Sequence, residues 1–309
     1  MIRIEKENIF KASLDQGINL FLGSGFSVFA KNQDGKSLPI GSQLVDELIN
    51  IFTLPATKSI SLPKISTILN KSNKPAFYEY LIKRFSVAEY DARYEILETL
   101  QIKTIFTTNI DDLIIKVFSN STLKYLNDLD IRGPSYFNRE AIDLVHLHGC
   151  VQTPNRQMFF GSQELAAAFH SDPDRWHLFT QRIQTVPTVF WGYQLDDSGT
   201  LEALNPRTVQ GRPHKPKWLQ VLPNLDEGDV EYFRALDFNI IIGDTDELLD
   251  YFQQREKSVF PVGKQRHQGT AEIFPSDAIP EIGKVPVKPI IDFYMGQPPT
   301  WGDIFSGNI

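Results

Sequence analysis

Cysteine is almost missing from this sequence, because Cys150 is the only one among 309 residues. A single cysteine excludes an internal disulfide and any zinc site that needs several cysteines. Long apolar runs are missing too, since none approaches the roughly 20 residues of a membrane-spanning helix. The charged, amphipathic segment 1–17 differs from a secretory signal peptide. We therefore expect a cytoplasmic protein without a membrane segment.

Positive charge is in deficit as well, because 31 Lys and Arg residues stand against 38 Asp and Glu residues, a formal net charge of -7. This balance gives no electrostatic reason to expect direct nucleic-acid binding. What is present is an ordinary globular composition, with 41% hydrophobic and 22% charged residues. The length exceeds the roughly 100–200 residues of one typical domain, so we expect a large domain with an insertion or a tail.

Short apolar runs alternate with amphipathic stretches along the chain. The runs mostly lack a regular alternation of apolar and polar residues, which is typical of strands buried on both faces of a parallel sheet. This order favours an α/β fold: an open, mostly parallel, Rossmann-like sheet with helices on both faces. The predicted strands are 18–23, 103–109, 143–149, 188–193, 218–223 and 239–244, and the main predicted helices are 43–52, 91–100, 110–118, 175–184 and 246–255.

The chain divides into a domain and a tail. We assign residues 1–255 to one domain that carries the functional site, with a helical insertion at about 40–100 between the first two predicted strands. Seven of the 19 prolines lie in the last 54 residues, which predicts an extended tail or linker over 256–309. We expect this tail to contact a partner, a further regulatory module or another copy of the chain in a homo-oligomer.

The stretch GSGFS, residues 23–27, directly follows the first predicted strand. A glycine turn at the carboxyl end of such a strand lets backbone N–H groups approach an anion such as phosphate. The third glycine of the dinucleotide-binding pattern G-x-G-x-x-G is missing, since Val28 takes its place. Two interpretations stay open, a phosphate-binding loop and a plain tight turn.

Polar residues follow the second predicted strand in the stretch TTNIDDL, which includes Thr108, Asn109, Asp111 and Asp112. At that position they would face the crevice in which open parallel sheets bind their ligands. Alternatively, Asn109 or Asp111 would accept N–H groups at the start of the next helix.

Two histidines end the third predicted strand in the stretch DLVHLHGC. His146 and His148 lie two residues apart, so on a strand their side chains point to the same face. His148 would stand at the strand's end, where a group that titrates near neutral pH suits a general base. The same spacing suits two metal ligands, which leaves a metal-dependent hydrolase as an alternative.

Two later strands end in a similar pattern. In VFWGYQLDDSGT, Gly192 closes the strand, and Asp197 would cap the next helix or face the crevice. In FNIIIGDTDELL, Asp244 would bind a ribose hydroxyl or cap a helix. Because the carboxyl ends of parallel strands share one edge of the sheet, we expect all these residues to surround one crevice.

The motifs GSGFS, TTNIDDL, LHG and GYQLDD, in this order over about residues 15–250, resemble the sirtuin-like domains. The similarity is to the bacterial branch found in anti-phage defence proteins, whose members hydrolyse NAD. The resemblance implies NAD as the substrate and a role in antiviral defence, as an effector that depletes NAD in abortive infection.

By this resemblance, Asn109 orients the nicotinamide ribose and the attacking water, and His148 is the catalytic base. Residues 23–27 would bind the diphosphate. A later motif is matched only in part, because Gln194 and Asp196 replace its serines. The residues assigned to NAD binding are Gly23, Ser24, Gly25, Ser27, Thr108, Asp111, Gly192, Asp197 and Asp244.

Deacetylating sirtuins also carry a four-cysteine zinc module, for which this chain lacks the cysteines. We therefore expect no zinc-ribbon module, no metal and no peptide deacetylation, but an NAD glycohydrolase. Nicotinamide leaves from a ring that is already cationic, so no general acid is needed, unlike in ordinary glycoside hydrolysis. A module that senses NAD or ADP-ribose without cleaving it stays open as an alternative.

Overall fold

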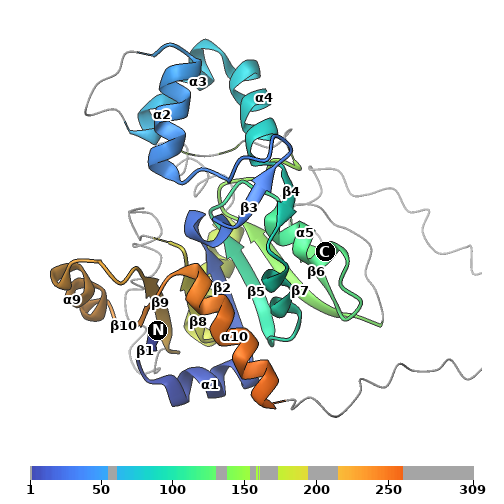
Figure 1. The fold of residues 1–309 in the computed structure, drawn as a ribbon, viewed down its shortest axis with the longest axis vertical. Coiled ribbons are helices and arrows are strands. Elements are labelled where there is room, and N and C mark those ends of the chain that lie inside the picture. Colours follow the sequence, from blue (N-terminus) through green and yellow to red (C-terminus); the bar gives the residue numbers. More distant parts are fainter. Residues whose placement is uncertain are drawn as a thin grey trace, which may run out of the picture. The chain divides into compact units, whose positions relative to one another are not determined.

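An eight-stranded sheet organises the chain in the computed structural model (Figure 1). The structure describes residues 2–54, 61–129, 138–153, 158, 160, 173–193 and 215–259, which lie in the unit Met1–Val262. The strand order is β1-β10-β9-β8-β2-β5-β7-β6. The strands are β1 (Arg3–Ile4), β2 (Ile18–Leu22), β5 (Ile102–Thr107), β6 (Lys124–Asp128), β7 (Glu140–His146), β8 (Thr188–Trp191), β9 (Lys217–Val221) and β10 (Phe238–Ile242).

The pairing is parallel throughout except for β1, which runs antiparallel to β10 at one edge. All six predicted strands are present, so the prediction of an open, mostly parallel sheet is confirmed. Two strands of the sheet, β1 and β6, were not predicted. No helix among the described residues is long and apolar enough to cross a membrane.

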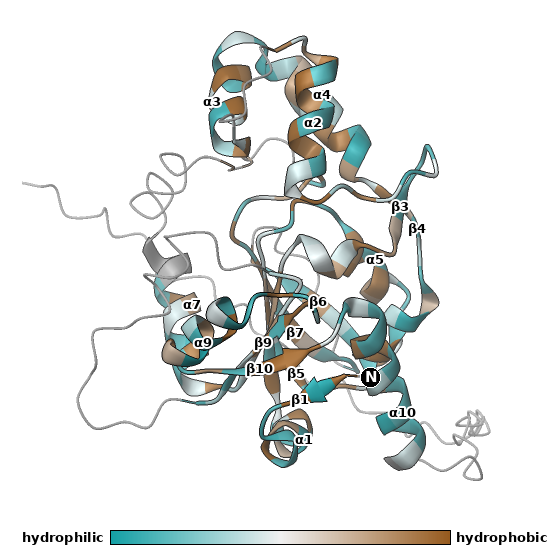
Figure 2. Ribbon diagram, turned by 60° about the vertical axis from the view of Figure 1, so that its left-hand side comes forward, coloured by the Kyte–Doolittle hydropathy of each residue, from teal (hydrophilic) through white to brown (hydrophobic). Residues whose placement is uncertain are grey.

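Helices cover both faces of the sheet, as predicted. Within β2, Leu20 and Leu22 pack on one face and Phe21 packs on the other, which is why this strand lacks alternation. Figure 2 shows the central strands mostly brown, whereas the helices mix brown and teal residues. One face carries α1 (Glu7–Gln16), the 3-10 helix η2 (Ala92–Glu98), α5 (Leu113–Ser119) and α10 (Thr245–Val259), and the other carries α7 (Pro173–Thr185) and α9 (Glu227–Ala235).

The predicted helix 91–100 is instead the 3-10 helix η2. Tertiary contacts attach η2 to the rest of the domain, because Arg93 forms ion pairs with α10 and the buried Tyr94 hydroxyl donates to Phe26 O. The helix predicted to start at residue 110 starts at Leu113, since Asp111 accepts the Leu113 N–H there.

A helical insertion separates β2 from β5, as predicted. Its base is a ribbon of two antiparallel strands, β3 (Ala30–Asn32) and β4 (Val87–Tyr90). Its helices are α2 (Gly41–Ile51), α3 (Leu62–Ser72) and α4 (Lys74–Phe85). They share a hydrophobic core of their own, and Ile110 and Val151 join that core. Because these two residues follow β5 and β7, the insertion lies at the carboxyl edge of the sheet (Figure 1).

The strand order places a switch point at β2. The chain leaves β2 for β5 on one side and later returns to β8 on the other. In open α/β sheets, ligands bind at the carboxyl ends of the strands where the order reverses in this way. The tail predicted over 256–309 lies outside the described residues from 260 onward, so that prediction and its domain boundary stay predictions.

Candidate active site at the carboxyl edge of the sheet

The glycine loop, residues 23–27, follows β2 at the switch point and contains the 3-10 helix η1 (Ser24–Ser27). Three of its backbone N–H groups donate within the protein: Gly23 N to Trp191 O at 3.0 Å, Gly25 N to Gly192 O at 2.9 Å and Phe26 N to Gly23 O at 2.9 Å. An anion at this loop would therefore be held by other donors, such as the hydroxyl of the exposed Ser24.

The glycines of this loop meet the backbone that follows β8. A Cβ atom on Gly23 would lie 2.5 Å from Gly192 O, and one on Gly25 would lie 2.8 Å from Gly192 Cα. Gly192 itself has a φ of +67°, and its added Cβ would lie 2.1 Å from Phe26 N. Close packing of two backbones thus requires all three glycines, a role that the sequence did not indicate.

Asn109 lies on the opposite side of the glycine loop, after β5, and is buried. Its Nδ2 donates to Gly23 O at 2.9 Å and to Ser27 Oγ at 3.1 Å. Its backbone N–H donates to Thr107 Oγ1 at 3.0 Å, which holds the turn after the strand. Within the described part of the chain, Asn109 Oδ1 makes no hydrogen bond. This oxygen is an acceptor that a substrate hydroxyl or a water could use.

Asp111 joins the same cluster with its two carboxylate oxygens. Oδ2 accepts the Ser27 hydroxyl at 2.9 Å, and Oδ1 accepts the Leu113 N–H at the start of α5 at 3.1 Å. Burial raises the pKa of Asp111 to about 6, although both hydrogen bonds act in the opposite direction. The helix-capping role considered from the sequence therefore holds for this residue, and its position in a ligand-binding crevice stays a prediction.

Two neighbours of this cluster have structural contacts. Asp112 is buried, and its carboxylate accepts Val87 N at 2.7 Å and Gln152 Nε2 at 3.0 Å, which links β4 to the segment after β7. Thr108 is half-buried, and its N–H and hydroxyl donate to Leu22 O at 3.1 and 3.3 Å. These bonds fix the end of β5 against the end of β2.

The two histidines lie in different surroundings. Strand β7 ends at His146, so the prediction of a strand continuing through His148 is wrong, because the chain bends there before Gly149, whose φ is +87°. His146 is buried with Nε2 3.4 Å from Asp128 Oδ2, whereas His148 is half-buried. Among the described residues, no group of three or more His, Cys, Asp or Glu is placed to hold a metal ion.

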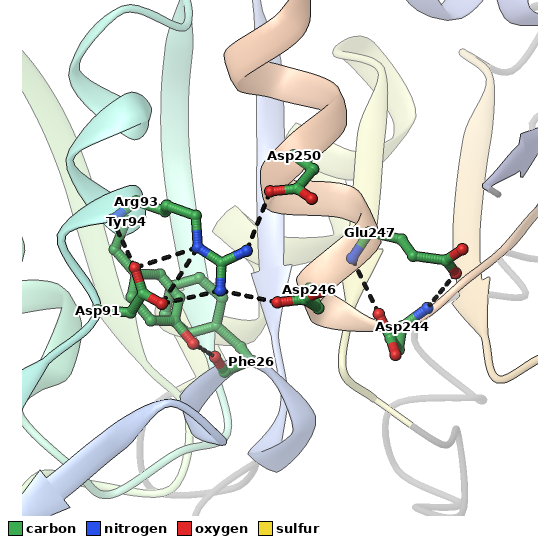
Figure 3. Close-up of polar contacts among 8 residues, drawn as sticks. All are labelled: Phe26, Asp91, Arg93, Tyr94, Asp244, Asp246, Glu247 and Asp250. Carbon is green, nitrogen blue, oxygen red and sulfur yellow. Dashed lines mark hydrogen bonds and ion pairs between the residues drawn. The ribbon is translucent and has the colours of Figure 1, made fainter.

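Asp244 lies at the same edge of the sheet, after the end of β10. Asp244 is exposed and caps α10, since its Oδ1 accepts Glu247 N at 2.9 Å and Glu247 Oε2 accepts Asp244 N at 3.3 Å (Figure 3). Cys150 is buried, and burial raises its pKa to about 12, so its thiol stays protonated at neutral pH. Gln194, Asp196 and Asp197 lie outside the described residues.

Sequence reasoning missed three side chains that hold the strand ends together. Thr245 Oγ1 donates to Gly25 O at 2.8 Å, and the Tyr94 hydroxyl donates to Phe26 O. Gln220 bridges two strand ends, because its Oε1 accepts Gly192 N at 2.9 Å and its Nε2 donates to Gly243 O at 3.1 Å. Of these three, only Thr245 could have been suspected from the sequence, because it follows the end of a strand, as the predicted site residues do.

Comparison with known families gives a match to part of the chain. Residues 103–240 match the sequence model of a family described as SIR2-like domain. The matched segment is a little under half of the chain and runs from β5 to β10. It includes Asn109, Asp111 and His148, but not the glycine loop. A search of curated proteins finds no match.

Proposed function

We propose that this protein is an NAD glycohydrolase, which cleaves NAD to nicotinamide and ADP-ribose. The SIR2-like domain implies an NAD-related activity. The observation that carries the finer proposal is the cluster in which Asn109 and Asp111, from the matched segment, contact Ser27 of the glycine loop. This cluster lies at the switch point of the sheet, where such folds bind nucleotides.

The chemistry asks little of the protein beyond positioning. The nicotinamide ring of NAD is already cationic and leaves as neutral nicotinamide, so no proton has to be donated to it. The remaining needs are an oriented ribose, a stabilised oxocarbenium-like transition state on that ribose and an aligned water. Asn109 Oδ1 is an acceptor suited to orient the ribose or the water. Asp111, mostly ionised at neutral pH, would place negative charge near the ribose ring, which becomes positive in the transition state. His148 would take the proton from water or from a ribose hydroxyl.

The proposed binding groups surround this centre. The diphosphate would lie along the glycine loop, with the Ser24 hydroxyl among its donors. Thr108 and Gly192 border the loop on its two sides and would contact the nucleotide. Asp197 and Asp244 are proposed ribose contacts, although Asp244 also caps α10. The proposal includes no metal.

The experiment is a turnover assay with the full chain and NAD, in which nicotinamide and ADP-ribose are quantified by chromatography. The His148→Ala variant should lose at least about 100-fold in rate, a typical effect of removing a general base. His177→Ala, at an exposed histidine of α7, is the matched control and should keep the parent rate. Equal rates for His148→Ala and the parent would contradict the assignment.

The same assay distinguishes hydrolysis from sensing. NAD or ADP-ribose binding, measured by calorimetry, without any product would point to a sensor that reports occupancy to a neighbour. Release of nicotinamide and ADP-ribose in equal amounts supports the glycohydrolase. Loss of activity with a chelator would instead support the metal-dependent hydrolase.

We further propose that the enzyme is a cytoplasmic effector of anti-phage defence that depletes NAD and is controlled by self-association or by a partner of the tail. Unregulated NAD hydrolysis would harm the host cell, so such control is expected. In bacteria that express the chain, phage infection should lower the cellular NAD level, and fewer plaques should form than on bacteria without it. The His148→Ala variant should abolish both effects. Light scattering of the purified chain would measure its oligomeric state.

A further inference from the structure

Two backbone carbonyls of the glycine loop are held by side chains from outside it. The Thr245 hydroxyl, at the start of α10, donates to Gly25 O at 2.8 Å. The Tyr94 hydroxyl, in η2, donates to Phe26 O. Both donor side chains are buried, with Thr245 5% and Tyr94 0% exposed; Phe26 is buried as well, whereas Gly25 is half-buried. The loop is therefore attached to two elements that lie far from it in the sequence.

Thr245 connects more than the loop. Its hydroxyl also accepts the Trp191 Nε1–H at 3.1 Å, and Trp191 is the last residue of β8. Because Gly25 N donates to Gly192 O, Gly25 is fixed at its N–H by one strand end and at its carbonyl by Thr245. The peptide between Gly25 and Phe26 is thus held at its carbonyl by the Thr245 hydroxyl and at its N–H by Gly23 O.

The elements that carry Thr245 and Tyr94 are also joined to each other. Arg93, in η2, forms ion pairs with Asp246 at 2.7 Å and Asp250 at 3.0 Å, both in α10 (Figure 3). The two aspartate side chains are about half exposed, at 49% and 50%, so solvent weakens these ion pairs. The bond from the buried Thr245 hydroxyl should therefore be weakened less by solvent than the ion pairs of Arg93, which join η2 to α10.

We propose that Thr245 is a positioning residue for NAD, which acts by holding the Gly25 carbonyl and so the shape of the glycine loop. The inference rests on the proposed function, because it assumes that this loop binds the diphosphate. Without the hydroxyl, Gly25 O and Trp191 Nε1 would both lose a buried partner, and the loop would rotate or move to find water. NAD affinity would fall. Asn109 would keep its place, because its backbone N–H donates to Thr107 Oγ1 and its Nδ2 donates to Gly23 O, outside the peptide that Thr245 holds. His148 follows β7 and would keep its place as well.

The test compares Thr245→Val, which keeps the shape but removes the hydroxyl, with Thr245→Ser, which keeps the hydroxyl. Thr245→Val should raise the KM for NAD about tenfold with kcat nearly unchanged, the effect of one buried hydrogen bond on binding. Thr245→Ser should restore the KM to near the parent value. Thr185→Val, the same change at an exposed position of α7, is the control and should leave KM unchanged. Hydrogen exchange without NAD should be faster at residues 24–27 in Thr245→Val.

The outcomes separate this inference from the proposed function. If the parent hydrolyses NAD and Thr245→Val has the parent's KM, the inference is overturned and the function stands. If Thr245→Val has a lower melting temperature but an unchanged KM, its role is structural and the inference is overturned as well. If the parent neither binds nor cleaves NAD, the proposed function fails together with the NAD part of the inference. Hydrogen exchange at residues 24–27 then decides whether Thr245 holds the glycine loop.

Discussion

The glycine loop has two neighbours that contact it in different ways. On the β8 side, backbone meets backbone, with Gly25 N bonded to Gly192 O and no room for a Cβ atom on either glycine. On the β5 side, the contacts come from side chains, with Asn109 Nδ2 on Ser27 Oγ and Ser27 Oγ on Asp111. The first side depends on the absence of side chains and the second on their functional groups.

This difference separates a side of the loop with a structural role from a side for which we propose a chemical role. On the β8 side the loop's hydrogen-bonding groups are used within the protein, which leaves little for a ligand. On the β5 side, Asn109 Oδ1 is an unused acceptor among the described residues, and Asp111 carries a raised pKa. Substitutions on the β8 side should therefore change stability first, and substitutions on the β5 side should change catalysis first.

The largest effect is expected on the β8 side, for Gly192→Ala. A Cβ atom 2.1 Å from Phe26 N, at a φ of +67°, forces the two backbones apart. We expect the free energy of unfolding to fall by about 2–5 kcal/mol, the sum of overpacking and backbone strain. Urea denaturation measures it. The control is Gly35→Ala, since Gly35 has a φ of +71° but nothing within 4 Å of its added Cβ. Equal losses for both variants would mean that the close contact contributes nothing.

A smaller effect, which depends on pH, is expected on the β5 side for Asp111→Asn. The pKa of Asp111 is raised from its ordinary 3.8 to about 6, so the folded state binds this proton more tightly than the unfolded chain. Its stabilising contribution is complete below pH 3.8 and is lost as the pH rises through 6. Between pH 4 and 7 the parent should lose up to about 3 kcal/mol of unfolding free energy relative to Asp111→Asn.

Urea denaturation at several pH values measures this difference. The matched control is Asp46→Asn, which removes an exposed carboxylate of α2. Curves for the parent and Asp111→Asn that stay parallel from pH 4 to 7 would show that burial does not raise the pKa of Asp111.

The smallest effect concerns the end of β10, where Asp244 caps α10. Asp244→Ala should lower the unfolding free energy by about 1 kcal/mol, whereas Asp244→Asn should keep most of it, because asparagine is also a good cap. Denaturation measures the cap, and the KM for NAD measures the proposed ribose contact. A raised KM for Asp244→Asn would indicate that Asp244 contacts NAD and does more than cap α10.

The sequence predicted the sheet well, for a physical reason. Strands buried on both faces are mostly apolar, with single buried polar residues such as Asn19 and Thr104, so six of the eight could be found as short runs. Strand β1 has only two residues, and β6, with the sequence KYLND, carries polar residues that no apolar run could reveal. The segment 91–100 has a helical pattern, but it forms a 3-10 helix in which Arg93 and Tyr94 make tertiary bonds that the pattern does not reveal.

The site was predictable only in part. Asn109, Asp111 and the glycine loop could be grouped because the carboxyl ends of parallel strands share an edge, and the structure brings these residues into contact. The use of the loop's N–H groups by Trp191 O and Gly192 O could not be predicted, since it depends on the distance between two backbones. The bond from Thr245 likewise depends on the tertiary packing of α10.

The central claim is that Asn109, on the β5 side of the loop, takes part in cutting NAD. Its most direct test is the rate of nicotinamide release from NAD by the parent, by Asn109→Ala and by the control Asn120→Ala, at an exposed asparagine after α5. Melting temperatures establish that each variant is folded. We predict that the parent and Asn120→Ala release nicotinamide at similar rates, and that Asn109→Ala is slower by on the order of 100-fold. A folded Asn109→Ala variant that releases nicotinamide as fast as the parent would contradict the claim.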